Sequence, residues 1–271
     1  MAGSRRAAFF DLDKTILATS SALAFTRPFY RGGLIGRRDV VRSAYAQFVF
    51  LASGADHDQM ETMRRYMSGL VRGWDVAKVQ EIVAETLDRI IDPVVYDEAL
   101  ELIEQHRDAG EDIVIISSSG SEVVEPIGER IGADVSVGTR LVVEDGRYTG
   151  EILFYAYGEG KAQAMRDLAA ERGYDLAECH AYTDSITDLP MLEEVGHPTA
   201  VNPDAELRRV AQERGWPILD FHRPVTMRGR VPTMGQGRAL ALGAAVVVGA
   251  FAVGVAWYLG NRRARCPGCA P

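Results

Sequence analysis

The chain has 271 residues, 47% of them hydrophobic, and a formal net charge of −8 at pH 7. This length allows a sizeable core, with one main domain and an insertion or appendage. The negative charge argues against a general nucleic-acid binder, because phosphate backbones are held by clustered basic residues. The three cysteines, Cys179, Cys266 and Cys269, make no disulfide framework. Too few apolar residues separate Arg6 from Asp11 for a signal peptide, so we expect the main body in the cytoplasm.

The first element is a short apolar run over residues 7–10, which predicts a buried strand that ends in Asp11 and Asp13. On an extended backbone these two side chains point the same way. Two carboxylates so close repel each other unless a metal ion or a shared proton compensates them. The pattern indicates a catalytic or metal site, although solvated acids at a strand end give the same pattern.

Apolar residues then recur at helical spacing from about residue 20 to residue 91, without a convincing strand. We predict a small helical bundle whose methionines and aromatic residues form its own core. One or two of its arginines could face the Asp11 strand and hold an anionic substrate. These arginines are Arg27, Arg31, Arg37, Arg38, Arg42, Arg64, Arg65 and Arg72.

The chain next alternates between helices and strands. A helix is predicted over residues 96–107, a strand over 113–116 that leads into Ser117, and a further helix from about Ser121. This order is one half of a doubly wound α/β fold, in which the turns after strands bind anions. A hairpin follows over residues 140–152, with its turn at Asp145-Gly146.

A helix opens at Gly158 and runs through Ala170, which places Lys161 in its first turn. Cations are unfavourable there, because the helix dipole is already positive at that end. Either an anion lies near Lys161 or the lysine is exposed to solvent.

The last strands bring further carboxylates. A strand delivers Asp184 at its end, and Asp188 follows at the turn into a helix that starts near Pro190. Strands over 199–201 and 217–219, with a helix over 205–214 between them, complete the predicted sheet. The histidines show no ligand spacing, and we interpret them as structural or surface residues; they are His57, His106, His180, His197 and His222.

The C-terminal region changes in composition. Residues 222–238 lose periodicity and predict a linker, and residues 239–259 contain no charged residue. That length suits a transmembrane helix, which needs about 20 residues, and Trp257 and Tyr258 would lie at the interface. Arginines flank both ends, so their distribution does not fix the orientation; we expect the catalytic domain in the cytoplasm. Cys266 and Cys269 could form a tail disulfide, a redox pair, a lipidation site or half of a zinc site, or remain inert.

Four segments occur in a specific order: FFDLDKTI, IVIISSSG, GEGK and AYTDSITDLPML. They resemble the four motifs of the haloacid dehalogenase (HAD) superfamily of phosphohydrolases, and the resemblance covers about residues 7–221. It is nearest to the phosphoserine-phosphatase-like branch, subfamily IB, which carries a helical cap after the first motif. The resemblance implies an α/β fold with a doubly wound, mainly parallel, Rossmann-like sheet. The expected organisation is a core of residues 1–19 and 92–221, a cap of 20–91, a linker of 222–238, a transmembrane helix of 239–259 and a tail of 260–271.

The resemblance also implies the catalytic roles. Asp11 is expected to attack phosphorus and become an aspartyl phosphate. Asp13 is expected to protonate the leaving group and later deprotonate water. Thr15, Ser117 and Lys161 are expected to bind the phosphate.

The implied cofactor is Mg²⁺. By the resemblance, its ligands are the Asp11 carboxylate, the main-chain carbonyl of Asp13 and Asp184, with Asp188 in a supporting role. The cation and Lys161 would make the encounter between several carboxylates and a phosphate favourable.

The substrate stays open. Phosphoserine phosphatases resembling this chain carry a glutamate shortly after the first motif, whereas residues 18–22 contain no acid. The predicted anchor suggests a phosphomonoester at the membrane face, such as a lysophospholipid or an isoprenoid phosphate. The alternatives are a phosphoserine phosphatase, a phosphotransferase that uses the same site, and a phosphate-binding membrane scaffold without catalysis. The sequence does not indicate an oligomeric state.

Overall fold

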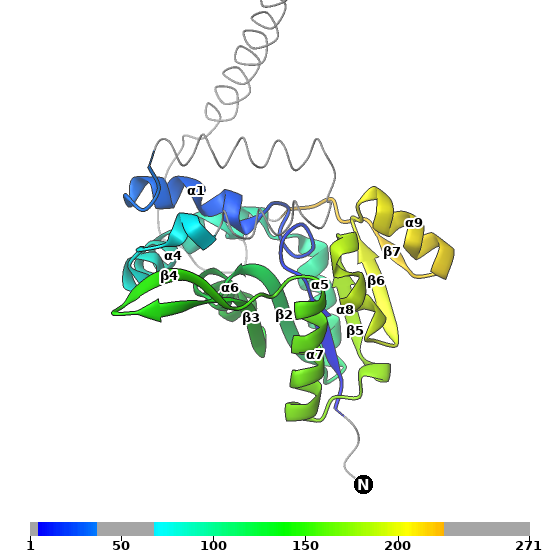
Figure 1. Cartoon of the computed structure of the whole chain (residues 1–271). Coiled ribbons are helices and arrows are strands. Elements are labelled where there is room, and N and C mark those ends of the chain that lie inside the picture. The colour runs from blue at the N-terminus through cyan, green and yellow to red at the C-terminus, as the bar shows by residue number, and fades with distance from the viewer. Residues whose placement is uncertain (1–4, 37–67, 225–271) are drawn as a thin grey trace, which may run out of the picture. The chain divides into compact units, whose positions relative to one another are not determined.

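The structure is a computed structural model that describes residues 5–36 and 68–224. Its strands form one sheet in the order β4-β3-β2-β1-β5-β6-β7 (Figure 1). The central strand β1 (Ala7–Phe10) pairs in parallel with β2 (Asp112–Gly120) and β5 (His180–Thr183). This arrangement confirms the predicted mainly parallel α/β sheet.

The outer strands extend this sheet on both sides. On one side β6 (His197–Val201) and β7 (Ile218–Leu219) add in parallel. On the other side β3 (Val135–Glu144) pairs in parallel with β2, and β4 (Arg147–Phe154) pairs with β3 as the predicted hairpin. The serines after Ile116, which we expected in a turn, instead continue β2 with a shift in register before Gly120.

Helices cover both faces of the sheet, as a doubly wound fold requires (Figure 1). One face carries α5 (Asp97–Asp108) and α6 (Ser121–Ile131). The other carries α7 (Glu159–Arg172), α8 (Leu189–Glu193) and α9 (Ala205–Arg214). Short 3-10 helices lie in the connections over Asp92–Val94, Leu176–Glu178 and Ile186–Asp188.

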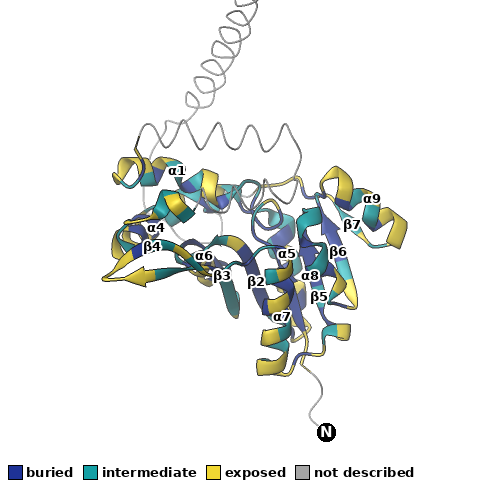
Figure 2. Ribbon diagram, viewed as in Figure 1, coloured by how far each residue is buried: buried dark blue, intermediate teal, exposed yellow. Residues whose placement is uncertain are grey.

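Strand β1 shows why the core has two halves. Its side chains alternate, so Ala8 and Phe10 pack on the α5 side whereas Ala7 and Phe9 pack on the α7 side. All four are buried, and the sheet is darkest in Figure 2 along its central strands. The apolar sequence of β1 is therefore explained by burial on both faces.

The described part of the predicted cap contains α1 (Ser21–Arg31) and α4 (Val76–Ile90). Phe25, Val79 and Val83 pack these helices into the same core as α6. Residues 37–67, which hold most of the remaining predicted cap, lie outside the described residues.

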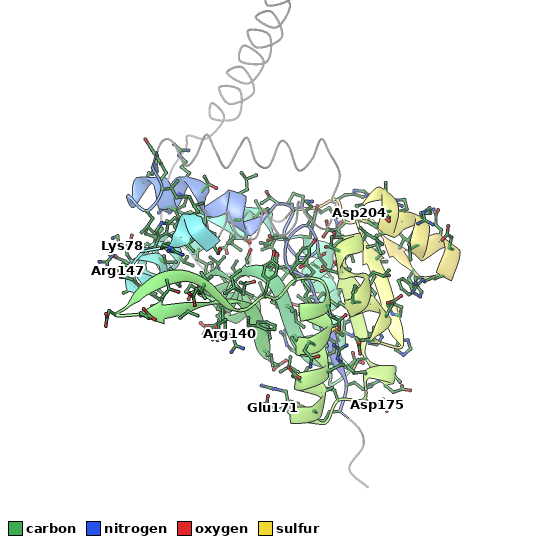
Figure 3. All side chains as sticks on the ribbon, viewed as in Figure 1. Lys78, Arg140, Arg147, Glu171, Asp175 and Asp204 are labelled. Atoms are coloured by element: carbon green, nitrogen blue, oxygen red, sulfur yellow. The ribbon has the colours of Figure 1, made fainter. Side chains whose placement is uncertain are left out.

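We predicted only helices in the cap, but one segment of it pairs with the sheet. Residues 73–76 form strand-like hydrogen bonds with the β3-β4 hairpin: the Gly73 amide donates to the Tyr148 carbonyl at 2.7 Å, and the Tyr148 amide donates to the Trp74 carbonyl at 3.1 Å. Arg147 adds a hydrogen bond of 2.9 Å to the Gly73 carbonyl. Arg147 also lies 3.7 Å from the carboxylate of Asp75, the residue before α4, and Figure 3 labels Arg147 together with Lys78 of α4 in this region. The hairpin therefore anchors this part of the cap to the core. Apolar spacing could not predict this contact, because it does not indicate which distant strand a backbone segment pairs with.

At the C-terminal end, the first residues of the predicted linker are held by α5. The Asp97 amide donates to the Arg223 carbonyl at 2.9 Å, and the Arg223 amide donates to the Glu98 carboxylate at 3.2 Å. The rest of the predicted linker, the predicted span 239–259 and the tail lie outside the described residues. Among residues 5–36 and 68–224, no helix has the length and apolar character to cross a membrane.

Candidate active site

The acidic residues predicted to act together meet at one edge of the sheet. Asp11 follows β1 and Asp184 follows β5, and these strands are parallel neighbours. Ser117 lies on β2, on the other side of β1. Because the carboxyl ends of parallel strands share an edge, the topology gathers these side chains from distant parts of the chain.

Lys161 reaches this edge from the first turn of α7 and is 2% exposed. Its ammonium group donates to Asp11 Oδ1 at 2.5 Å and to Asp188 Oδ2 at 2.7 Å. Burial alone would lower the pKa of Lys161, but the carboxylates of Asp11 and Asp188 outweigh burial and raise the pKa above its ordinary value. The structure thus places an anion beside the lysine, and the exposed-lysine alternative is wrong.

The two glycines before Lys161 have separate structural roles. Gly158 precedes α7 with a φ of 52°, a conformation that glycine adopts without strain. A Cβ on Gly160 would lie 2.0 Å from the carbonyl oxygen of Tyr155. The glycines therefore let the chain turn tightly and approach its own backbone before delivering Lys161 to the site.

Asp13 is held by the beginning of the cap helix α1. The Ser21 amide donates to Asp13 Oδ1 at 2.8 Å, and the Ser20 hydroxyl donates to Oδ2 at 3.3 Å. The Ser21 hydroxyl is also 2.7 Å from the hydroxyl of Ser119 on β2. The residue types of these serines did not predict these contacts, because serine is common at helix starts such as Ser20 and Ser21 and in serine runs such as the one that contains Ser119.

Asp184 and Asp188 differ in their partners. The Asp188 carboxylate, besides Lys161, accepts a hydrogen bond of 2.7 Å from Thr183 Oγ1. Asp184 lies 3.7 Å from the ammonium of Lys14, whose side chain is 64% exposed. Burial raises the pKa of Asp184 from its ordinary value of 3.8 to about 6, with Lys14 opposing the shift and Asp188 adding to it.

The pKa of Asp11 is shifted by the same kinds of cause as that of Asp184. Burial raises its pKa above the ordinary range, Lys161 opposes the shift, and Asp188, Asp184 and Asp13 reinforce it. The site therefore concentrates carboxylates in a buried space, and a cation that binds oxygen would relieve their repulsion.

The two hydroxyls predicted to bind phosphate are both buried: Thr15 is 1% exposed and Ser117 is fully buried. Thr15 Oγ1 has no hydrogen-bond partner among residues 5–36 and 68–224. A buried hydroxyl left unpaired costs about 1–3 kcal/mol, so this orphaned group fits a site that is completed by an anion. The Ser117 hydroxyl accepts a weak hydrogen bond of 3.3 Å from the Ser119 amide.

Among the described cap arginines, no contact with the residues of this site is found. Arg27 and Arg31 lie exposed on α1, and Arg72 lies beside Gly150 of the hairpin. The others lie outside the described residues. An arginine that holds the substrate therefore stays a prediction.

Curated relatives resemble almost the whole chain. It is 62% identical over 263 residues to a Streptomyces azureus protein named "Inhibition of morphological differentiation protein", covering 96% of this chain and 95% of the relative. It is 56% identical over 260 residues to a protein of Mycobacterium tuberculosis named "Probable phosphatase", covering 96% and 90%. It is 38% identical over 241 residues to a Mycobacterium tuberculosis protein named "Phosphoserine phosphatase", covering 88% and 77%.

A solved structure has the same fold. A protein of unknown function from Bordetella pertussis Tohama I superposes with a TM-score of 0.71 at 30% sequence identity, covering 80% of this chain and 99% of that chain. The family model for haloacid dehalogenase-like hydrolases matches residues 8–193, a stretch that includes Asp11, Lys161 and Asp188. The predicted family and the predicted hydrolase class are confirmed, and the chain belongs to the haloacid dehalogenase-like hydrolases, with relatives that are named phosphatases.

Proposed function

We propose that this enzyme is a Mg²⁺-dependent phosphomonoester hydrolase that acts through an aspartyl phosphate on Asp11. The observation that carries the proposal is the buried Asp11-Lys161-Asp188 cluster, with contacts of 2.5 and 2.7 Å, at the edge where β1, β2 and β5 end. A buried cation beside a carboxylate nucleophile is suited to a dianionic substrate, because it offsets the repulsion between them.

The donor set fits Mg²⁺. Asp11 and Asp184 are buried carboxylates whose pKa values are raised by burial and by repulsion from neighbouring carboxylates. Oxygen ligands of this kind suit a small hard cation. Asp11, Asp184 and the main-chain carbonyl of Asp13 would hold the ion, with Asp188 in a supporting role. When bound, the ion supplies positive charge to the phosphoryl oxygens and allows the carboxylates to stay ionised.

The chain's own residues divide the chemistry into two steps. A carboxylate oxygen of Asp11 attacks phosphorus and forms an O–P bond, while the bond to the leaving oxygen breaks and that oxygen takes a proton from Asp13. Asp13 then takes a proton from water, which attacks phosphorus and releases phosphate and the Asp11 carboxylate. Thr15 and Ser117 donate hydrogen bonds to the phosphoryl oxygens.

The geometry of Asp13 supports its role as acid and base. The Ser21 amide and the Ser20 hydroxyl fix both oxygens of its carboxylate from the start of the cap helix. Proton transfer in the transition state depends on such positioning, because the donor must lie within hydrogen-bond reach of the leaving oxygen.

The substrate is proposed to be a phosphomonoester at a membrane face, with residues 239–259 as the tether and the catalytic domain in the cytoplasm. The first turn of α1 contains no acidic residue, so the described cap start offers no carboxylate to an amino group. Phosphoserine is the second candidate, since one relative is named a phosphoserine phosphatase. A phosphotransferase would use the same residues, with an alcohol in place of water.

The test is phosphate release by the purified full-length chain with Mg²⁺ across amino-acid, sugar, nucleotide and lipid phosphomonoesters. We expect turnover that chelation abolishes and that Asp11→Asn removes while circular dichroism stays unchanged. Appreciable turnover by Asp11→Asn would contradict the assignment of the nucleophile. No turnover on any substrate, by a folded protein presented also in lipid vesicles, would favour the scaffold alternative. An added alcohol that captures the phosphoryl group would indicate a transferase.

A further inference from the structure

A second group of metal-ligand side chains lies at the opposite edge of the sheet from Asp11. It consists of His106 near the end of α5, Glu111 just before β2, and His180, the first residue of β5. At about 3.3 Å per residue along a strand, His180 and Asp184 are separated by roughly 13 Å. Figure 3 shows these two edges through Asp175, near the amino end of β5, and Asp204, near the carboxyl end of β6. The proposed phosphatase reaction therefore does not use this group.

The three side chains converge on one point. Glu111 Oε2 lies 2.6 Å from His106 Nδ1 and 3.3 Å from His180 Nδ1. All three donor atoms lie within 4.8 Å of one another. The side chains of His106, Glu111 and His180 are 9%, 3% and 25% exposed. The site is thus largely shielded from water, with one side reachable from solvent past His180.

An orphaned atom points to a missing ligand. The Nδ1 atom of His180 is buried, yet it makes no hydrogen bond within the described residues, because its contact with Glu111 lacks hydrogen-bond geometry. Hydrogen bonding within the cluster satisfies His106 and Glu111 but leaves this nitrogen unpaired, at a cost of about 1–3 kcal/mol. A cation bound by the nitrogen lone pair would remove that cost. A purely structural hydrogen-bond cluster gives no reason for the unpaired atom.

The second ring nitrogen of His106 is held as it commonly is in a metal-bound histidine. His106 Nε2 lies 2.7 Å from the hydroxyl of Tyr182, which stacks on Phe10. Histidine ligands commonly hold their second ring nitrogen in such a hydrogen bond, which fixes the ring orientation. The guanidinium of Arg6 lies 3.5 Å from the other oxygen of Glu111, Oε1, so Oε2 remains directed at the two histidines.

We propose that His106, Glu111 and His180 form a zinc site, separate from the proposed Mg²⁺ site. Two imidazole nitrogens and one carboxylate oxygen suit Zn²⁺, whereas Mg²⁺ prefers oxygen alone. Three protein ligands leave a fourth position for a solvent molecule on the side of His180. The proton on His106 Nδ1 moves to solvent or to the other ring nitrogen when the metal binds, and Glu111 retreats from its 2.6 Å hydrogen bond to ligand spacing.

The spacing of the histidines along the sequence does not indicate this site, and the interpretation of His106 and His180 as structural or surface residues stays the alternative to the proposal. Glu111, just before β2, and His180, at the start of β5, are far apart in the chain. Only the pairing of β1 with both β2 and β5 brings them together.

The experiment is competition for Zn²⁺ between a chromogenic chelator and the full-length chain. All variants are made in a chain that carries Asp184→Asn, called the background chain. This substitution weakens binding of Zn²⁺ at the proposed Mg²⁺ site. We expect His180→Gln to remove one zinc per chain or to weaken its binding at least tenfold. Glu111→Gln, which keeps the size of the side chain, should do the same. The matched control is His197→Gln, since His197 stacks on His180 at 4.6 Å without belonging to the ligand group.

Comparing the variants isolates this site from any other zinc ligand in the chain. Cobalt substitution adds a second readout: visible absorption of low-coordinate Co²⁺ should appear in the background chain and be lost in His180→Gln. Melting curves in chelator show that each variant is folded. Equal zinc binding in the background, His180→Gln and Glu111→Gln would overturn the proposal. Equal loss in His197→Gln would overturn it too, because binding would not then depend on the ligand atoms.

Discussion

Replacing Asp184 with Asn should stabilise the metal-free protein at neutral pH while abolishing its response to Mg²⁺. The Asp184 carboxylate is 11% exposed, and its only ion-pair partner among the described residues is Lys14, at 3.7 Å. The pKa of Asp184 rises from 3.8 to about 6. At about 1.4 kcal/mol per pKa unit, ionising Asp184 costs about 3 kcal/mol more in the folded chain than in the unfolded chain. Asn mimics the protonated acid in size and carries no charge.

The pH dependence of this effect has a defined sign. Because the pKa of Asp184 is higher in the folded than in the unfolded chain, the folded chain binds this proton more tightly. The contribution of Asp184 to stability is therefore fully present below about pH 4, falls as the pH rises to about 6, and stays low above it. At pH 8 we expect metal-free Asp184→Asn to be more stable than the original chain by about 2–3 kcal/mol, and at pH 4 by much less.

The assay is urea unfolding of both chains at pH 4 and pH 8, in chelator and in Mg²⁺. Added Mg²⁺ should stabilise the original chain at pH 8 and have little effect on Asp184→Asn. The matched control is Asp220→Asn, an acid about half exposed and paired with Arg208, whose loss should change stability by less than about 1 kcal/mol. Destabilisation of metal-free Asp184→Asn by the same amount at both pH values would refute the reasoning.

Three further predictions concern the residues around the nucleophile. Lys161→Met should abolish turnover and lower the free energy of unfolding by about 3–5 kcal/mol, because two buried carboxylates lose their partner; urea unfolding at an unchanged midpoint would contradict this. Ser20→Ala should slow hydrolysis of alkyl phosphates severalfold more than that of nitrophenyl phosphate, whose leaving group needs no acid; equal slowing in steady-state assays would argue against positioning of Asp13. Gly160→Ala should lower both melting temperature and turnover, because its Cβ would meet the Tyr155 carbonyl, whereas Gly69→Ala, with open space around it, should do neither.

The sequence alone predicted the central strands of the core. The apolar run of residues 7–10 and the β-branched run before Ser117 predicted the strands β1 and β2, because strands buried on both faces need continuous apolar sequence. The position of Lys161 in the first turn of α7 was predicted as well. Short motifs at strand ends identified the family, since their order along the chain depends on local sequence only.

The tertiary structure decided how these pieces meet. The contacts of Lys161 with Asp11 and Asp188 and the hold of Ser20 and Ser21 on Asp13 depend on strand order and helix placement. The pairing of the hairpin with residues 73–76 also depends on strand order and helix placement, and so does the cluster around Glu111. Side-chain periodicity reports which face of an element is buried, but not which distant element lies against that face. Contacts between elements remote in sequence are therefore fixed only when the whole sheet assembles.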